Sequence, residues 1–112
     1  MYPSEIINKL RATVDKLHAK EEELQELSLE KAESERAYKV AKAKAIVRLR
    51  VEGTPVGVIQ DLADGEVANL KLEKELSEDN YFIALQVIES YRKELEVYRG
   101  ILSFLKVEYS TS

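Results

Sequence analysis

The stretch YFIALQVIESYRKELEVYRGILSFLKVEY, residues 81–109, decides the fold. Its apolar and aromatic residues recur at alternating spacings of three and four: Tyr81, Ala84, Ile88, Tyr91, Leu95, Tyr98, Leu102, Leu105 and Tyr109. This alternation is typical of a helix that packs one seam against another helix, whereas a β-strand would alternate every second residue. We therefore expect a long helix here, in which the tyrosine rings bury apolar area at the seam and their hydroxyls reach its edge.

The N-terminal half of the chain supplies the expected partner helix. Ser4 is suited to cap it, and no Pro or Gly follows until Gly53. The seam that we predict for this helix is strong at first, polar in the middle and built from small residues at the end: Ile7, Leu10, Val14, Leu17, Leu24, then Ser28, Lys31, Glu35, then Tyr38, Ala41, Ala45, Leu49.

A short connecting element follows. Gly53 tolerates the left-handed conformation that ends many helices, and Thr54-Pro55 fits a cap followed by a first helical residue. We expect Asp64-Gly65 to close this short helix. Its apolar face is predicted to contain Val56, Ile59, Leu62 and Ala63.

These segments predict an all-α fold, an antiparallel hairpin of two long, coiled-coil-like helices with a short connecting helix. Pairing Glu52 with Glu66 places Leu17 near Ile101. The sequence leaves open whether the long helices break near residues 28–36 and 77–80. We expect one domain over residues 1–112, comprising a helix at 4–52, a turn and short helix at 53–65, a helix at 66–109 and a disordered tail at 110–112.

A second apolar stripe accompanies the C-terminal seam. Val97, Ile101 and Phe104 follow one another at spacings of four and three, and Ile6 broadens the facing helix. A two-helix hairpin buries one stripe per helix, so we expect these four residues to form an oligomer interface in a helical bundle, as a dimer or a higher oligomer. Gly100 marks either a close helix crossing in that oligomer or simple tolerance of glycine.

Composition narrows the classes of function. The 112 residues include no Cys, which excludes disulfides and thiolate metal sites. The net charge of −4 argues against a generic nucleic-acid coat. No apolar run reaches the length of a transmembrane helix, and the N-terminal residues lack the features of a signal peptide, so we expect a cytoplasmic protein.

The sequence carries no motif for catalysis, a cofactor or a small molecule. Its many glutamates alternate with lysines at helical spacing, which is typical of a solvated helix face. His18 is the one histidine, and Asp15 three residues before it does not complete the Glu-x-x-His repeats of di-metal bundles. We therefore predict a protein that is not an enzyme and binds no metal or cofactor.

One charge feature is not random. No acidic residue lies between Glu35 and Glu52, and this interval contains a basic segment: Arg36, Lys39, Lys42, Lys44, Arg48 and Arg50. A solvated face is the simpler interpretation. The alternative is a patch that contacts the phosphates of a nucleic acid, although Tyr38 is the only aromatic residue there and lies on the seam.

The connecting segment EGTPVGVIQDLADG, residues 52–65, resembles small proteins of tailed phages and prophages of Gram-positive bacteria. In that family a Gly-x-Pro-Val, an apolar pair and Asp-Leu/Ile-Ala-x-Gly join two long charged helices. Gly57 and Gln60 depart from the pattern. The likeness extends loosely over residues 36–105. It implies a phage setting, near recombination and replication genes, and no assigned activity.

Two hypotheses of function follow. The first is a non-enzymatic coiled-coil interaction protein of phage type, oligomeric, which binds another phage or host protein in the host cytoplasm. The second is a nucleic-acid-associated accessory factor of phage recombination or replication, which uses the basic segment 36–50. The unburied apolar stripe favours the first, because exposed apolar area demands a partner more strongly than exposed charge does.

Overall fold

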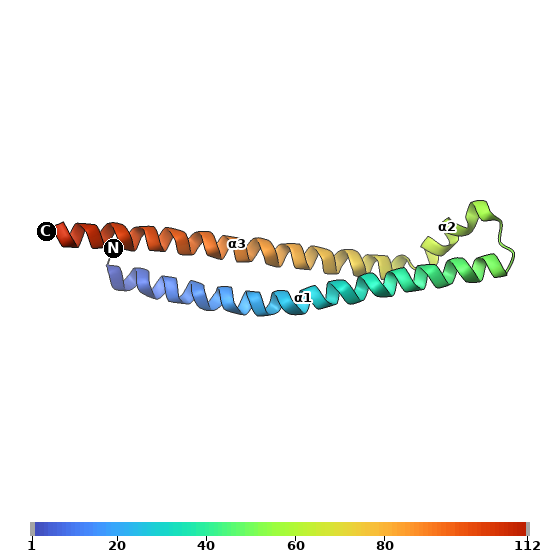
Figure 1. Ribbon diagram of the computed structural model, residues 1–112, viewed down its shortest axis with the longest axis horizontal. Coiled ribbons are helices and arrows are strands. Elements are labelled where there is room, and N and C mark those ends of the chain that lie inside the picture. Colours follow the sequence, from blue (N-terminus) through green and yellow to red (C-terminus); the bar gives the residue numbers. More distant parts are fainter. Residues whose placement is uncertain (1, 112) are drawn as a thin grey trace. The chain divides into compact units, whose positions relative to one another are not determined.

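The computed structural model describes residues 2–111, with the side chains of residues 2–108. These residues form three helices and no strand: α1 (Pro3–Val51), α2 (Val56–Glu66) and α3 (Ala68–Thr111) (Figure 1). The predicted fold class, two long helices joined by a short one, is confirmed. Neither long helix breaks at residues 28–36 or 77–80. The prediction of a disordered tail is wrong for Ser110 and Thr111, which belong to α3, and Ser112 lies outside the described residues.

Tertiary contacts group the chain into two compact units. The terminal unit contains the chain up to Gln25 and the chain from Ile83 onward, and the turn unit is Glu26–Phe82. Each unit therefore pairs a segment of α1 with a segment of α3. The expectation of a single domain stays a prediction.

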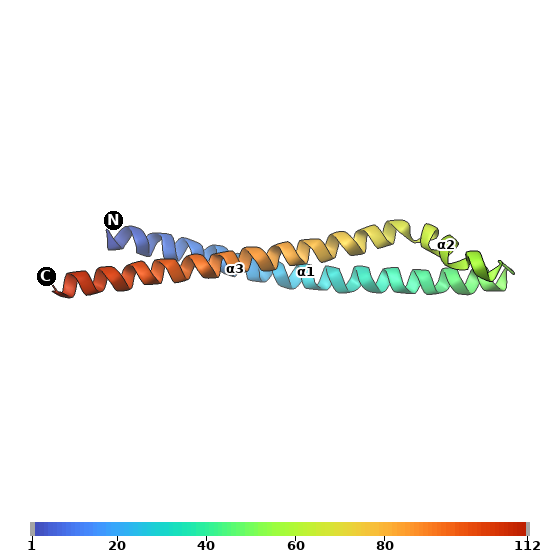
Figure 2. The ribbon, with the colours of Figure 1, turned by 90° about the horizontal axis from the view of Figure 1, so that it is seen from above.

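In the terminal unit, the two helical segments run antiparallel and side by side (Figures 1 and 2). Leu17, Ile88 and Leu95 form the buried core. Four partly buried residues pack against it: Leu10, Val14, Leu24 and Tyr91. The α3 seam predicted from spacing is confirmed, since its members from position 84 to 105 are buried or partly buried; the side chain of Tyr109 lies outside the described residues.

The seam of α1 in this unit includes Leu10, Leu17 and Leu24 as predicted, but it differs from the prediction at two places. Ile6 and Thr13 are buried, whereas Ile7 is exposed and Val14 is partly buried. Thr13 tolerates burial because its hydroxyl donates a hydrogen bond to Oε1 of Glu94, 3.3 Å away. The same carboxylate oxygen accepts a 2.6 Å hydrogen bond from Tyr98. A polar contact thus sets the alignment of the two helices here.

Gly53 ends α1 as predicted, with φ of +80°. The amide of Gly53 donates to the carbonyl of Arg50, and the amide of Thr54 donates to that of Leu49. These two bonds form a Schellman motif, which satisfies carbonyls at the end of the helix. The predicted cap at Thr54 is wrong: Pro55 occupies the N-cap position of α2, and its carbonyl accepts from the amide of Val58.

In the turn unit, α2 lies back along the last turns of α1 (Figure 1). Ile59 and Ala63, two residues of the face predicted from spacing, pack against Ala45 and Leu49. The other two residues of the predicted face, Val56 and Leu62, are exposed.

The junction between α2 and α3 lies later than predicted. Gly65 is inside α2, the helix ends at Glu66, and its C-cap residue Val67 is buried. The amide of Val67 still donates to Ala63, and its carbonyl accepts from Lys71, so little backbone hydrogen bonding is lost there.

The predicted register of the two long helices is also wrong, because α2 folds back along α1. It assumed that the short helix merely bridges two long ones, which would pair Glu52 with Glu66. Because α2 itself runs antiparallel to α1, Arg48 pairs with Glu66 instead. In the terminal unit, Leu17 accordingly clusters with Ile88 and Leu95 and not with Ile101.

Polar and aromatic contacts replace apolar packing in the middle of the chain. Within the turn unit, the hydroxyls of Ser34 and Ser77 lie 2.6 Å apart across the two helices. The ammonium group of Lys31 lies 5.5 Å from the ring centre of Tyr81, a cation–π contact. Lys74 lies at the same distance from the ring of Tyr38. Ser28, which was expected on the seam, is exposed.

Candidate functional site

The basic segment lies on α1 in the turn unit, and three of its six residues form ion pairs. Lys39 pairs with Glu35 at 3.1 Å, and Lys42 pairs with Asp64 of α2 at 2.9 Å. Arg48 bridges Glu52 and Glu66. The pairs of Lys42 and Arg48 join α1 to α2, so these two cations hold the turn together.

The pKa shifts follow from these contacts. The hydrogen bond with Asp64 raises the pKa of Lys42 above its ordinary value. The hydrogen bond to Glu66, followed by that to Glu52, raises the pKa of Arg48. The hydrogen bond from Lys39 lowers the pKa of Glu35. Each shift favours the charged form, so these groups stay ionised at neutral pH.

The other half of the basic segment is not engaged in ion pairs. Among the residues that the structure describes, Arg36, Lys44 and Arg50 are exposed and form no ion pair within 4.0 Å. Three of the six basic residues therefore form ion pairs and the other three do not. The spacing of the residues in the sequence alone could not reveal this division.

The residues predicted to form the oligomer interface also differ from one another, in how far their side chains are exposed. On α3, Val97 and Phe104 are 59% and 68% exposed, and Ile101 beside them is partly buried. Ile6 is only 1% exposed, because it is buried within the terminal unit, so its side chain is not accessible to a second chain and does not belong with the other three. We call Val97, Ile101 and Phe104 the α3 stripe.

A further exposed row was missed in the sequence. Val40, Ala43, Val47 and Val51 lie on α1 in the turn unit, and all four are exposed. Their spacings of three, four and four place them along one side of the helix. The signal was present in the sequence, but the surrounding Lys and Arg residues favoured the interpretation of a solvated face. We call these four residues the α1 stripe.

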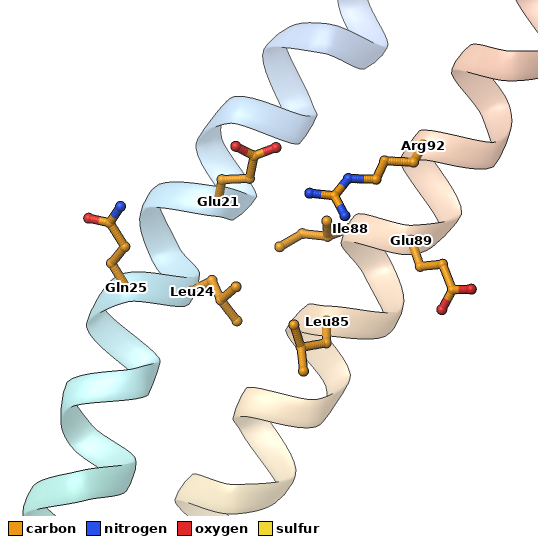
Figure 3. A pocket seen from close by; sticks show the side chains of 7 residues that line it. All are labelled: Glu21, Leu24, Gln25, Leu85, Ile88, Glu89 and Arg92. Carbon is orange, nitrogen blue, oxygen red and sulfur yellow. The ribbon is translucent and has the colours of Figure 1, made fainter.

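The terminal unit also contains an open groove of about 630 Å³ between α1 and α3 (Figure 3). Leu24, Leu85 and Ile88 point into it, and Glu21 and Arg92 lie at its upper edge in this view. The remaining lining residues are Gln25 and Glu89, whose side chains point away from the groove. This groove is a gap between two packed helices. The arginine and the glutamate that line it beside the leucines do not form an acid–base pair or a nucleophile with its base.

His18 lies exposed on α1, where it lines a shallow depression with Glu21, Glu22 and Gln25. No group of three His, Asp or Glu side chains in the described part of the chain is placed to hold a metal ion. Nor does any described helix combine the length and the apolar character needed to cross a membrane.

The surfaces that remain as candidates are the α3 stripe in the terminal unit and the α1 stripe with its basic neighbours in the turn unit. No family model, curated protein or solved structure matches the chain in comparisons with known proteins.

Proposed function

We propose that this protein is a non-enzymatic helical interaction protein that self-associates through the α3 stripe and binds a second protein. The observation that carries the proposal is the exposure of Val97 and Phe104 on a helix whose opposite seam is already buried. Burying a side chain of this size is worth roughly 1.5–3 kcal/mol, which offsets part of the entropy lost when two chains join. In a twofold bundle, each copy would cover the stripe of the other.

The C-terminal turns of α3, which follow the α3 stripe, also support this proposal. The C-terminal turns of α3 extend past the first turn of α1 within the terminal unit (Figures 1 and 2). The facing helix therefore leaves the end of α3 uncovered on more than one side. A second copy provides the simplest complementary surface.

The proposal also includes the cellular setting of the protein. The resemblance of residues 52–65 to the connecting segment of small phage and prophage proteins supports a place in the cytoplasm of an infected or prophage-carrying bacterium. The second protein would then be of phage or host origin.

Light scattering tests the self-association. The wild-type protein should be at least a dimer at micromolar concentration, and Phe104→Glu or Ile101→Glu should dissociate it with the helices retained in circular dichroism. Phe82→Glu is the matched control, because Phe82 is 56% exposed on α3 but lies in the turn unit. A well-folded wild-type monomer would contradict the proposal.

A second candidate function, nucleic-acid association, is favoured by the exposure of Arg36, Lys44 and Arg50 without ion pairs. Lys42 and Arg48 are poor choices for its test, since their substitution would also break contacts with α2. In a mobility-shift assay, DNA binding by the wild type should weaken steeply with salt and be lost when Arg36, Lys44 and Arg50 are all changed to Glu. Absence of a shift at low salt would remove this candidate.

A further inference from the structure

The α1 stripe gives this helix two apolar faces in the turn unit. One face, with Ala45 and Leu49, is buried against Ile59 and Ala63 of α2. The other is the α1 stripe, whose central residue Val47 is 58% exposed. Single apolar residues on a surface are normal, but these four follow the helix period over more than three turns. Valine is also a weaker helix former than alanine, so the exposed valines do not serve the helix itself.

Basic residues border this stripe on both sides. At 3.6 residues per turn, Lys44 and Arg48 follow one edge, and Lys39 and Arg50 follow the other. Arg36 lies in line with the stripe, one turn before Val40. Three nearby acidic residues, Glu35, Glu52 and Glu66, are paired with Lys39 or Arg48. An apolar row between two charged edges is the arrangement by which helices select an oppositely charged helix.

We propose that the α1 stripe and its basic edges dock an acidic amphipathic helix of a partner protein. The apolar side of that helix would cover Val40, Ala43 and Val47, and its flanking carboxylates would meet Lys44 and Arg50. A carboxylate near one end of that helix would meet Arg36. This inference rests on the proposed function as an interaction protein, and it names the surface and the chemistry of the second protein.

The same surface fits a nucleic acid less well. Phosphate groups make no favourable contact with a row of valines between the cations. Burying those valines against the charged backbone of a nucleic acid gains no free energy. Stacking of bases would require an exposed aromatic ring. Tyr38, the aromatic residue of this segment, is partly buried, and the ammonium groups of Lys74 and Lys42 lie 5.5 Å and 6.0 Å from its ring centre.

Three fluorescent peptides of about three heptads serve as probes in an anisotropy titration. The acidic probe has leucine at the core positions and glutamate on both edges. The basic probe has lysine on the edges, and the serine probe keeps the glutamates but has serine at the core positions. The acidic probe should bind the full chain, more weakly as salt rises, and both other probes should bind at least roughly tenfold more weakly.

Matched variants locate the binding. Val47 and Val97 are 58% and 59% exposed, each within a long helix, but Val47 belongs to the α1 stripe and Val97 to the α3 stripe. Val47→Ser should weaken binding of the acidic probe roughly tenfold without changing the oligomeric state. Val97→Ser should leave probe binding unchanged. Changing Lys44 and Arg50 together to Glu should abolish probe binding, and circular dichroism should show all these variants folded.

Several outcomes would overturn the inference. These are no binding of the acidic probe, equal binding of the acidic and serine probes, or equal effects of Val47→Ser and Val97→Ser. Binding of a DNA duplex that is lost in the Lys44, Arg50 double variant but kept in Val47→Ser would assign the surface to phosphates instead. Failure of self-association alone, with probe binding intact, would contradict the proposed dimer and leave this inference standing.

Discussion

Two glycines of the turn unit occupy opposite backbone environments. Gly53 has φ of +80°, which an L side chain adopts only under strain, whereas Gly65 lies within α2 and a Cβ atom added there would meet open space. We predict that Gly53→Ala lowers the free energy of unfolding by about 1–2 kcal/mol. Gly65→Ala should raise it by about 0.5–1 kcal/mol, because alanine favours the helix. Urea unfolding followed by circular dichroism measures both, and effects of the same sign would contradict the positions of these helix ends.

Tyr98 provides a prediction with a pH dependence. Its hydroxyl donates to the Glu94 carboxylate at 2.6 Å, and this hydrogen bond raises the pKa of Tyr98 above its ordinary value of 10.0. A pKa that is raised by folding stabilises the fold below the ordinary pKa, and this contribution disappears as pH rises through the raised value. Tyr98→Phe should therefore be less stable than the wild type near neutral pH, and the difference should shrink above about pH 10. A difference in urea midpoint that stays constant between neutral and alkaline pH would show that the hydrogen bond contributes no pH-dependent stability.

At the scale of the elements, spacing predicted which face of each long helix is buried better than it predicted alignment. The seam of α3 was correct because every candidate position carries an apolar or aromatic residue, so that the alternation of three and four has no interruption. On α1 the choice between Ile6 and Ile7 was ambiguous, since both are apolar. Thr13 was missed because its partner, Glu94, comes from the other helix and is not a neighbour in sequence.

The register could not be predicted for a related physical reason. A glycine and a proline mark where a helix ends, but not the direction in which the next one runs. The packing of Ile59 and Ala63 on Ala45 and Leu49 lays α2 back on α1, and this moves the start of α3 along the hairpin. The candidate surfaces were likewise predicted in part: the α3 stripe was found, without Ile6, and the α1 stripe was not.

A pair of isoleucines tests the seam of α3. Ile88 is 3% exposed in the core of the terminal unit, whereas Ile83, in the same helix and unit, is 55% exposed. Ile88→Ala should lower the free energy of unfolding by about 2–5 kcal/mol, because it leaves a cavity next to Leu17 and Leu95. Ile83→Ala should change it by less than about 0.5 kcal/mol. Thermal or urea unfolding of the two variants makes the comparison, and a larger loss for Ile83→Ala would mean that the seam faces another way.

At the scale of the whole molecule, charged residues make up 34% of the chain, and the apolar core is confined to narrow strips. A protein of this kind gains little stability from a deep interior. The two proposed surfaces lie in different units, the α3 stripe in one and the α1 stripe in the other. Single substitutions on one surface should therefore leave the other measurable.

The Schellman turn at Gly53 joins the two halves of the chain. These halves pack against each other in both units, since each unit pairs part of α1 with part of α3. Peptides of residues 1–52 and 54–112, made separately, should therefore carry complementary seams without a covalent link. Alone, each should lose much of its helix content, because long amphipathic helices depend on a partner. Mixed, they should regain it, with a melting temperature that rises with concentration; full helicity of either monomeric half alone would contradict this. The peptide bond at the turn then acts as a tether that replaces a bimolecular encounter by an effective concentration on the order of millimolar.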